Sequence, residues 1–205
     1  MSELEIAESF DHTVESTEHK NLLEDLFGIG EVEKAPSMEI QVKEIAETFF
    51  EIPELQFETW KEMSAVERVE TLQSFEAEVA KIECREASII KSEDLGDTCN
   101  GMFSGATRDI SINSRLLESN SEKDYKQVLE TFFHEGRHAY QYHNLYVEQT
   151  EQNSVMVETW HINEHILGYN SGDYGLFGYE EYYTQPVEAD ANIFADEAMR
   201  QLDLR

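Results

Sequence analysis

A chain of 205 residues with 40% hydrophobic and 11% aromatic residues can bury a substantial core, which excludes a protein that is disordered throughout. Its 44 acidic and 15 basic residues give a net charge of −29, so repulsion argues against a nucleic-acid backbone or an anionic membrane surface as its partner. The same charge suits a basic protein partner or simply high solubility, and the scarcity of proline favours a helix-rich α+β fold.

The first 37 residues are acidic and polar, and we expect residues 1–37 to form a mobile arm. Residues 22–27 are a short apolar patch within it and a candidate docking segment. Residues 34–37 have the composition of a linker, so the folded domain is expected to span residues 38–205.

The start of the sequence and its apolar runs bear on localisation. The sequence starts without a basic and apolar leader and contains no apolar run of membrane-spanning length. We therefore expect a cytoplasmic protein, with signal-independent export left open. The cysteines, Cys84 and Cys99, form no CxxC motif and suit a reduced compartment, although one disulfide between them also remains open.

Two helices are expected in the N-terminal half of the domain. Apolar residues at helical spacing predict the first over residues 38–51, and Pro53 ends it. Ser64 and Glu67 have the spacing of a capping box and predict a second helix that starts there and reaches about Cys84.

Two short strands are predicted next. Residues 87–90 read as the first, and Asp109–Asn113 alternates polar and apolar side chains as a half-buried strand does. Gly101 and Gly105 lie between these strands and are expected to break the chain.

The C-terminal half is expected to contain three more helices. Residues 123–144 form the first, with Ser121 as its cap, and residues 155–167 form the second. Residues 168–184 are rich in glycine and tyrosine and are predicted to be a loop. Pro186 suits the first turn of a final helix that reaches about residue 202.

The predicted helix over residues 123–144 contains an HExxH motif, His134-Glu135-Gly136-Arg137-His138. Helix positions i and i+4 lie on one face, so His134 and His138 can share one zinc ion. Glu135 then reaches a water on that zinc, whose pKa the metal lowers to about 7, and accepts its proton. The motif therefore predicts a catalytic zinc site.

A helical wheel tests whether these histidines belong to the core. It places His134 and His138 opposite the apolar side of their helix, together with Gln127 and Gln141. Core histidines are therefore not expected here, and the remaining alternative is a pair of solvated histidines on a polar face.

A catalytic zinc needs a third protein ligand, and Glu188 is the best candidate. Its face of the final helix is otherwise small and apolar, with Ala191 and Ala195 allowing close approach to the HExxH helix. A carboxylate buried there needs a partner such as a metal, whereas the alternative is a Glu favoured by the helix dipole. Asp190 is expected to point away from the metal; it, Asp196 and Asp173 are weaker candidates.

A second pattern competes for the metal. His161, Glu164 and His165 form the inverted motif HxxEH. No following helix supplies it with an obvious inward carboxylate, so we interpret this segment as a partly exposed helix that packs through Trp160.

The segments HEGRHAYQ and YYTQPVEADA carry a family resemblance. They resemble ImmA/IrrE-type peptidases and, more closely, the metallopeptidase domains of bacterial polymorphic toxins, over about residues 55–202. The resemblance implies a zincin-like fold, in which a small sheet and the HExxH helix pack against a C-terminal helix that carries a glutamate. It implies that His134, His138 and Glu188 bind one zinc ion and that Glu135 is the general base.

The resemblance also bears on other residues. Asn192 stands four residues after Glu188, where many such peptidases place an Asp that supports a ligand histidine. The strand Asp109–Asn113 would be the edge on which an extended peptide aligns. No oxyanion-stabilising residue is implied, and the phenols that could donate to an oxyanion are Tyr174, Tyr179, Tyr182 and Tyr183.

These observations predict a zinc metallopeptidase that hydrolyses a peptide bond in a protein or peptide substrate, as a toxin-like or regulatory protease. Two alternatives stay open. One is a non-catalytic acidic protein that binds a basic partner or imitates the charge of DNA. The other is a zincin scaffold that keeps its metal without activity.

Overall fold

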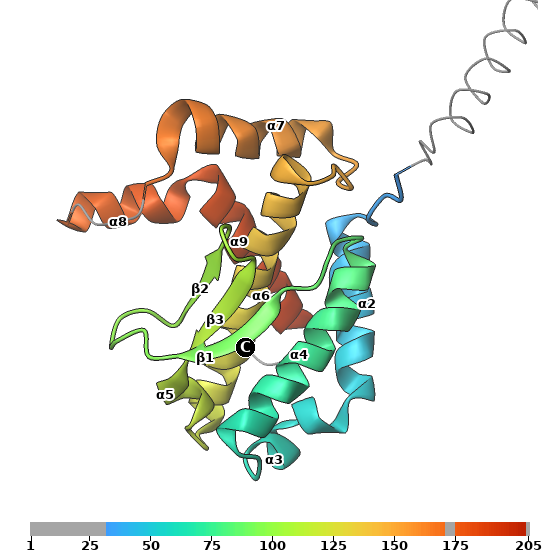
Figure 1. Ribbon diagram of the computed structural model, residues 1–205, viewed down its shortest axis with the longest axis vertical. Helices are drawn as coiled ribbons and strands as arrows, with labels where there is room; N and C mark the ends of the chain where they lie inside the picture. The colour runs from blue at the N-terminus through green and yellow to red at the C-terminus, as the bar shows by residue number, and fades with distance from the viewer. Residues whose placement is uncertain (1–31, 171–174, 204–205) are drawn as a thin grey trace, which may run out of the picture. The chain divides into compact units, whose positions relative to one another are not determined.

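The computed structural model describes residues 32–170 and 175–203, and it divides the chain into two compact units, Met1–Glu33 and Lys34–Arg205. The second unit confirms the expected helix-rich α+β class. Figure 1 labels its elements. The helices are α2 (Met38–Glu51), α3 (Phe57–Trp60), α4 (Ala65–Ile82), α5 (Ser114–Leu117), α6 (Glu122–Tyr146), α7 (Ser154–Ile162), α8 (Gly175–Thr184) and α9 (Pro186–Gln201), with a 3-10 helix η1 (Pro53–Leu55) and a π-helix η2 (Asn163–Gly168). The strands are β1 (Ile89–Glu93), β2 (Gly101–Ser104) and β3 (Asp109–Asn113).

The three strands form one sheet in the order β1-β3-β2, with β1 parallel and β2 antiparallel to β3. The prediction that Asp109–Asn113 is a half-buried edge strand is therefore wrong, because β3 is central and all its residues are buried. Its polar side chains have partners: Asn113 Nδ2 donates to the carbonyls of Gly96 and Cys99. The open edge near α6 belongs to β2.

β2 was missed because Gly101 looked like a chain break. Gly101 is instead the first residue of the strand, where β2 passes close to α6. A Cβ at this position would lie 2.3 Å from Cγ2 of Thr131 and 3.3 Å from Cγ of Glu135. The glycine is thus needed for a close approach of strand to helix.

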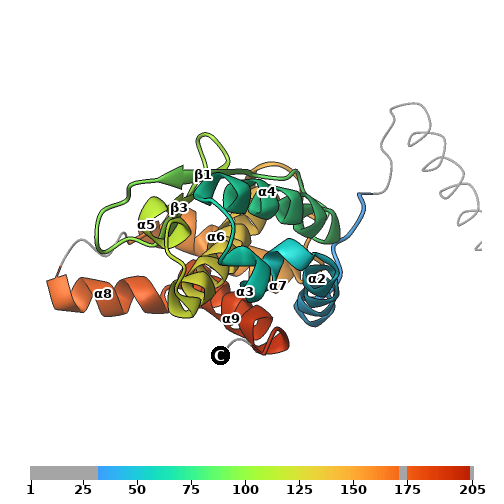
Figure 2. The same cartoon turned by 90° about the horizontal axis from the view of Figure 1, so that it is seen from below.

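Helix α6 lies at the centre of the unit, between the sheet and α9 (Figure 2). It begins at Ser121, whose side chain accepts a hydrogen bond from the backbone of Asp124. The apolar side of α6 is fully buried against α4, the sheet and α9, in a core that includes Phe75, Ile110, Ile112, Val128, Leu129, Phe132, Phe133 and Phe194. Burying these aromatic and branched side chains fixes the position of α6.

The structure also bears on the predicted start of one helix and on one predicted loop. The capping box of Ser64 and Glu67 starts α4, with both reciprocal hydrogen bonds present. The loop predicted for residues 168–184 is wrong in its second half, since α8 covers Gly175–Thr184; residues 171–174 lie outside the described residues. Glycine costs about 1 kcal/mol in a helix interior, but tertiary contacts override such propensities, and here α8 packs against α9 with Gly178 buried.

Residues 34–37 are not the linker we expected. Ala35 is 1% exposed and packs in a cluster with Tyr140, Trp160 and Val187. Its backbone N–H donates to the carbonyl of Thr150 at 3.1 Å. The folded unit therefore begins at Lys34. The expectation of an arm with a docking patch at 22–27 falls outside the described residues.

Two further expectations concern helices and cysteines. None of the described helices is long and apolar enough to span a membrane. Within the described part of the chain, Cys84 and Cys99 are not joined by a disulfide.

Candidate metal centre

The HExxH residues lie on α6, and Glu188 lies in the first turn of α9, which Pro186 begins. Ala191 and Ala195 are buried on the face that α9 turns toward the core, as expected for helices in close contact. The structure brings His134, His138 and Glu188 together, with one ligand atom from each within 4.8 Å of the others. The candidate site is therefore assembled from two helices that are far apart in sequence.

The distances among these atoms can be compared with those of a zinc site. The two Nε2 atoms of His134 and His138 are 3.1 Å apart. Glu188 Oε2 is 3.2 Å from His134 Nε2, and Glu188 Oε1 is 3.3 Å from His138 Nε2. A tetrahedral zinc bound at about 2.0–2.1 Å keeps its ligand atoms about 3.3 Å apart. The two imidazoles and the carboxylate thus fit the metal in both chemistry and spacing.

Glu188 is 1% exposed, so its charge requires compensation. Its Oε1 accepts a hydrogen bond from the Tyr169 hydroxyl at 2.6 Å. Its Oε2 is buried beside His134 but does not complete a hydrogen bond. A buried carboxylate oxygen in this state is what a cation would complete.

The electrostatics of the three groups are strongly coupled. Burial alone would raise the pKa of Glu188, but the interactions with His134 and His138 outweigh it and hold this pKa well below its usual range. Burial alone would lower the pKa of His138, but the interactions with Glu188 and Glu135 outweigh it and raise this pKa to about 9. The pocket therefore favours positive charge between the histidines and Glu188.

Glu135 lies beside this group and is anchored by β2. Glu135 is 8% exposed, and its Oε2 accepts a hydrogen bond from the backbone N–H of Phe103 at 2.8 Å. Burial raises the pKa of the Glu135 carboxyl above its ordinary value. The strand thus holds the carboxylate in a fixed orientation next to the two histidines.

The group opens into a cleft of about 620 Å³. Its walls come from β2, α6, η2 and the start of α9, and its acidic side chains are Glu135, Glu164 and Glu188. None of the described residues that line it is a Lys or Arg. Its apolar and aromatic wall consists of Met102, Phe103, Tyr142, Leu145, Tyr146 and Val187. A cleft of this size is typical of ligand-binding sites.

Two tyrosines line this cleft near Glu188, Tyr169 and Tyr182, and of these only Tyr182 was among the expected phenols. Tyr169 was missed because it stands at the edge of the segment interpreted as a loop. Tyr183 is 51% exposed. Tyr174 and the side chain of Tyr179 lie outside the described residues.

The neighbours expected for the site differ in part. Among the described residues, the ring nitrogens of His134 and His138 that have partners contact Gln141, Glu188 and each other rather than Asn192, whose Nδ2 is buried without a hydrogen-bond partner. Asp190 is not in the group of possible metal donors; it is 9% exposed and accepts hydrogen bonds from Arg137 and Gln141. Asp196 is exposed, and Asp173 lies outside the described residues. Gln141 is the supporting neighbour that sequence reasoning missed, although its i, i+3 spacing from His138 on α6 could have identified this contact in advance.

The histidines of the competing HxxEH motif do not join this group, although its Glu164 lines the same cleft. His161 and His165 are exposed on α7 and η2, with their rings 4.6 Å apart. Within the described ranges, His134, His138 and Glu188 are the group of three donors that could hold a metal ion, and His161 and His165 are not joined by a third.

Comparisons with known proteins add no assignment. The chain matches no protein-family model, no curated protein and no solved structure. A function for this protein therefore has to be inferred from the geometry of the site.

Proposed function

We propose that this protein is a zinc-dependent peptidase with a zincin-like arrangement of sheet, HExxH helix and Glu-bearing helix. The observation that carries the proposal is the convergence of His134, His138 and Glu188 from two helices, next to the buried carboxylate of Glu135. Three protein ligands together with an open cleft are typical of catalytic zinc sites, whereas structural zinc sites use four ligands.

A zinc ion held by His134, His138 and Glu188 would supply a Lewis acid that polarises the scissile carbonyl and acidifies a water molecule. Glu135 is the base in this proposal: it accepts the proton of the attacking water and passes it to the amine that leaves. Phe103 N–H holds Glu135 Oε2, so Oε1 is the oxygen that takes up the proton.

The substrate would align on β2. This strand lies at the edge of the sheet, and its residues Gly101, Met102 and Phe103 line the cleft. An extended peptide can pair with such an edge strand, here through backbone groups other than the Phe103 N–H, which donates to Glu135. Tyr182 is the phenol we assign to donate to an oxyanion in this proposal, since it lines the cleft and the hydroxyl of Tyr169 already donates to Glu188. A toxin-like or regulatory role rests only on the family resemblance and is part of the proposal.

Cleavage of a peptide library, read by mass spectrometry, tests the proposal. The zinc-loaded protein should cut peptides, and treatment with a chelator should stop it. Glu135→Gln is the matched control: it should keep zinc and the fold but lose about 10²- to 10⁴-fold in rate, because the amide cannot accept the proton. Full activity in Glu135→Gln would remove Glu135 as the base. A zinc-loaded protein that cuts nothing would instead favour the inactive scaffold, and one without zinc the acidic binding protein.

A further inference from the structure

We propose that Gln141, held in place by Asp190 and Arg137, is a positioning residue that orients His138 toward the metal. The inference rests on the proposed zinc site and concerns residues outside the ligand set. It accounts for two features that the zinc chemistry leaves unused: an arginine inside the HExxH motif and a buried Asp190 next to the ligand helix.

The first step is the orientation of the Gln141 side-chain amide, which is 3% exposed. Its Nε2 donates to the carbonyl of Val187 at 2.9 Å and to Oδ2 of Asp190 at 2.8 Å. A backbone carbonyl and an ionised carboxylate can only accept hydrogen bonds. The amide nitrogen must therefore face α9, and its oxygen must face the opposite way.

The second step concerns His138. Oε1 of Gln141 lies 2.9 Å from Nδ1 of His138. Because this oxygen only accepts, Nδ1 must carry the proton, and Nε2 of the neutral ring keeps its lone pair. That lone pair is on the nitrogen nearest to His134 and Glu188. Gln141 thereby selects the tautomer that can bind a metal and fixes the ring plane.

The third step is the anchor of Asp190. Arg137 donates to it with two nitrogens, Nε to Oδ2 at 2.8 Å and Nη2 to Oδ1 at 3.2 Å. Two parallel hydrogen bonds of this kind fix the orientation of the carboxylate relative to the guanidinium. Asp190 is therefore fixed before it fixes Gln141.

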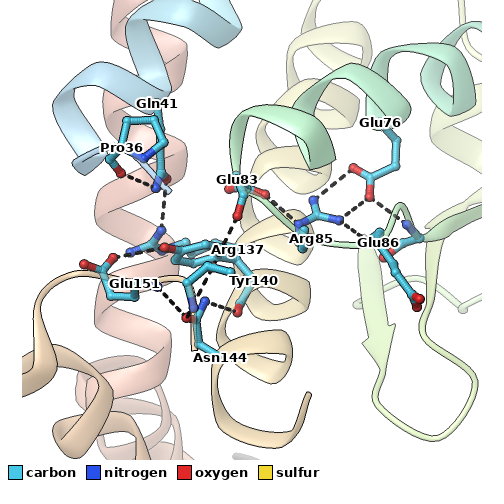
Figure 3. Close-up of polar contacts among 12 residues, drawn as sticks. Pro36, Gln41, Glu76, Glu83, Arg85, Glu86, Arg137, Tyr140, Asn144 and Glu151 are labelled. Atoms are coloured by element: carbon cyan, nitrogen blue, oxygen red, sulfur yellow. Dashed lines mark hydrogen bonds and ion pairs between the residues drawn. The ribbon is translucent and has the colours of Figure 1, made fainter. Parts of the chain in front are cut away.

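The fourth step is the surroundings of Arg137, which is 0% exposed. Its guanidinium carbon lies 4.6, 5.1 and 5.3 Å from the ring centroids of Tyr140, Phe194 and Trp160, respectively. Nη1 donates to Oε1 of Gln41 on α2, as Figure 3 shows. Contacts from α2, α6, α7 and α9 thus hold the arginine, and the chain of contacts ends at the metal ligand His138.

The test compares two substitutions at Gln141 that separate positioning from packing. Gln141→Met has a similar length but no hydrogen-bond acceptor for His138. Gln141→Glu keeps an acceptor for Nδ1 but loses the two donors and places a second carboxylate beside Asp190. If Gln141 served only packing, the methionine would be tolerated at least as well as the glutamate.

The measurements are the zinc dissociation constant, from competition with a chromophoric chelator, and the melting temperature of the metal-free protein. Gln141→Met should weaken zinc binding about 10- to 100-fold, the effect typical of losing a partner of a ligand histidine. The metal-free Gln141→Glu protein should melt at a lower temperature than metal-free Gln141→Met. It should nevertheless bind zinc about tenfold more tightly than Gln141→Met, because a carboxylate that accepts from Nδ1 restores the orientation of His138. Cobalt substitution should show the same order, with the visible absorption of the wild type kept in Gln141→Glu and altered in Gln141→Met.

The matched control is Gln127→Met on the same helix, where the glutamine amide donates to Glu130 at the surface. It should bind zinc like the wild type. Equal zinc affinity in Gln141→Met and wild type would overturn the positioning role while leaving the proposed function intact, and so would weaker binding by Gln141→Glu than by Gln141→Met. A wild-type chain that binds no zinc would overturn the proposed function and this inference with it.

Discussion

Two clusters of buried charge in the same domain differ in how the charge of a buried carboxylate is compensated. In the first, Arg85 lies between Glu76 and Glu83, with Nη1 2.6 Å from Glu76 and Nε 2.7 Å from Glu83 (Figure 3). In the second, Glu188 faces His134 and His138. Glu76 and Glu188 are equally removed from water, at 0% and 1% exposed.

The difference lies in where the positive charge comes from. Glu76 accepts from two nitrogens of Arg85 and from the backbone of Ser88, so hydrogen bonds within the protein satisfy both of its carboxylate oxygens. Glu188 has no arginine or lysine among the described residues that line its cleft. The first cluster is closed to solvent and structural, whereas the second is open and lacks a permanent cation. The second could therefore bind a cation from solution.

Removal of a ligand gives the largest effect that the comparison predicts. His134→Ala and His138→Ala should reduce bound zinc from about one per chain to background, because two protein ligands rarely hold zinc. Glu188→Ala should weaken zinc binding sharply. Metal analysis of the purified variants measures each of these effects.

The matching change in the closed cluster is Glu76→Gln, which should leave zinc untouched. Stoichiometric zinc in both histidine variants would contradict the assignment and point to His161 and His165. Unchanged zinc in Glu188→Ala alone would make it a helix-dipole residue and leave the HExxH assignment standing.

The closed cluster should dominate stability instead. Arg85→Met leaves two buried carboxylates unpaired and should cost about 4 kcal/mol of unfolding free energy, measured by denaturant titration. Lys81→Met is the matched control, because the Lys81–Glu78 pair is also 2.7 Å long but lies at the surface. It should change stability too little to measure. Loss of zinc in a folded Arg85→Met protein would show that the two clusters are not independent.

The grouping of His134, His138 and Glu188 could be predicted because its signals are local. The i, i+4 spacing of His134 and His138 sets their common face whatever surrounds the helix. Glu188 stood out as a carboxylate on a face of small residues, where burial demands a partner. The capping box at Ser64 likewise determines where α4 starts without help from the rest of the fold.

The remaining features depend on contacts between distant segments. Gly101 looks like a chain break in sequence, and only the position of Thr131 on α6 explains why it lies in a strand. The role of β3 as the central strand depends on which neighbours pair with it. Asp190 meets Arg137 only because α9 packs against α6. No local periodicity carries that information.

Gly101→Ala sharpens the distinction between the metal ligands and the base. The added Cβ would overlap Thr131 and crowd Glu135, so we expect a loss of about 3 kcal/mol and lower activity, with zinc retained. Gly96→Ala is the control: its added Cβ meets nothing within 4 Å, but its φ is +73°, and this strain should cost about 1 kcal/mol. Equal stability losses in the two variants would contradict the close approach of β2 to α6.

The smallest expected effect concerns residues 34–37, which connect to the polar network behind the metal centre. Gln41 donates to the carbonyl of Pro36 and accepts from Arg137 (Figure 3). Ala35 donates a backbone hydrogen bond to Thr150 and accepts one from the side chain of Gln152.

A chain lacking residues 1–33 should keep the melting temperature of the full protein, since those residues form a separate unit. A chain lacking residues 1–37 should lose about 2 kcal/mol of unfolding free energy, because these hydrogen bonds vanish and Nε2 of Gln41 loses its acceptor. Thermal unfolding of the two truncated proteins measures the difference. Equal melting temperatures would restore the linker interpretation of residues 34–37, whereas weaker zinc binding in the shorter chain alone would extend the support of His138 from Arg137 to Gln41 and Pro36.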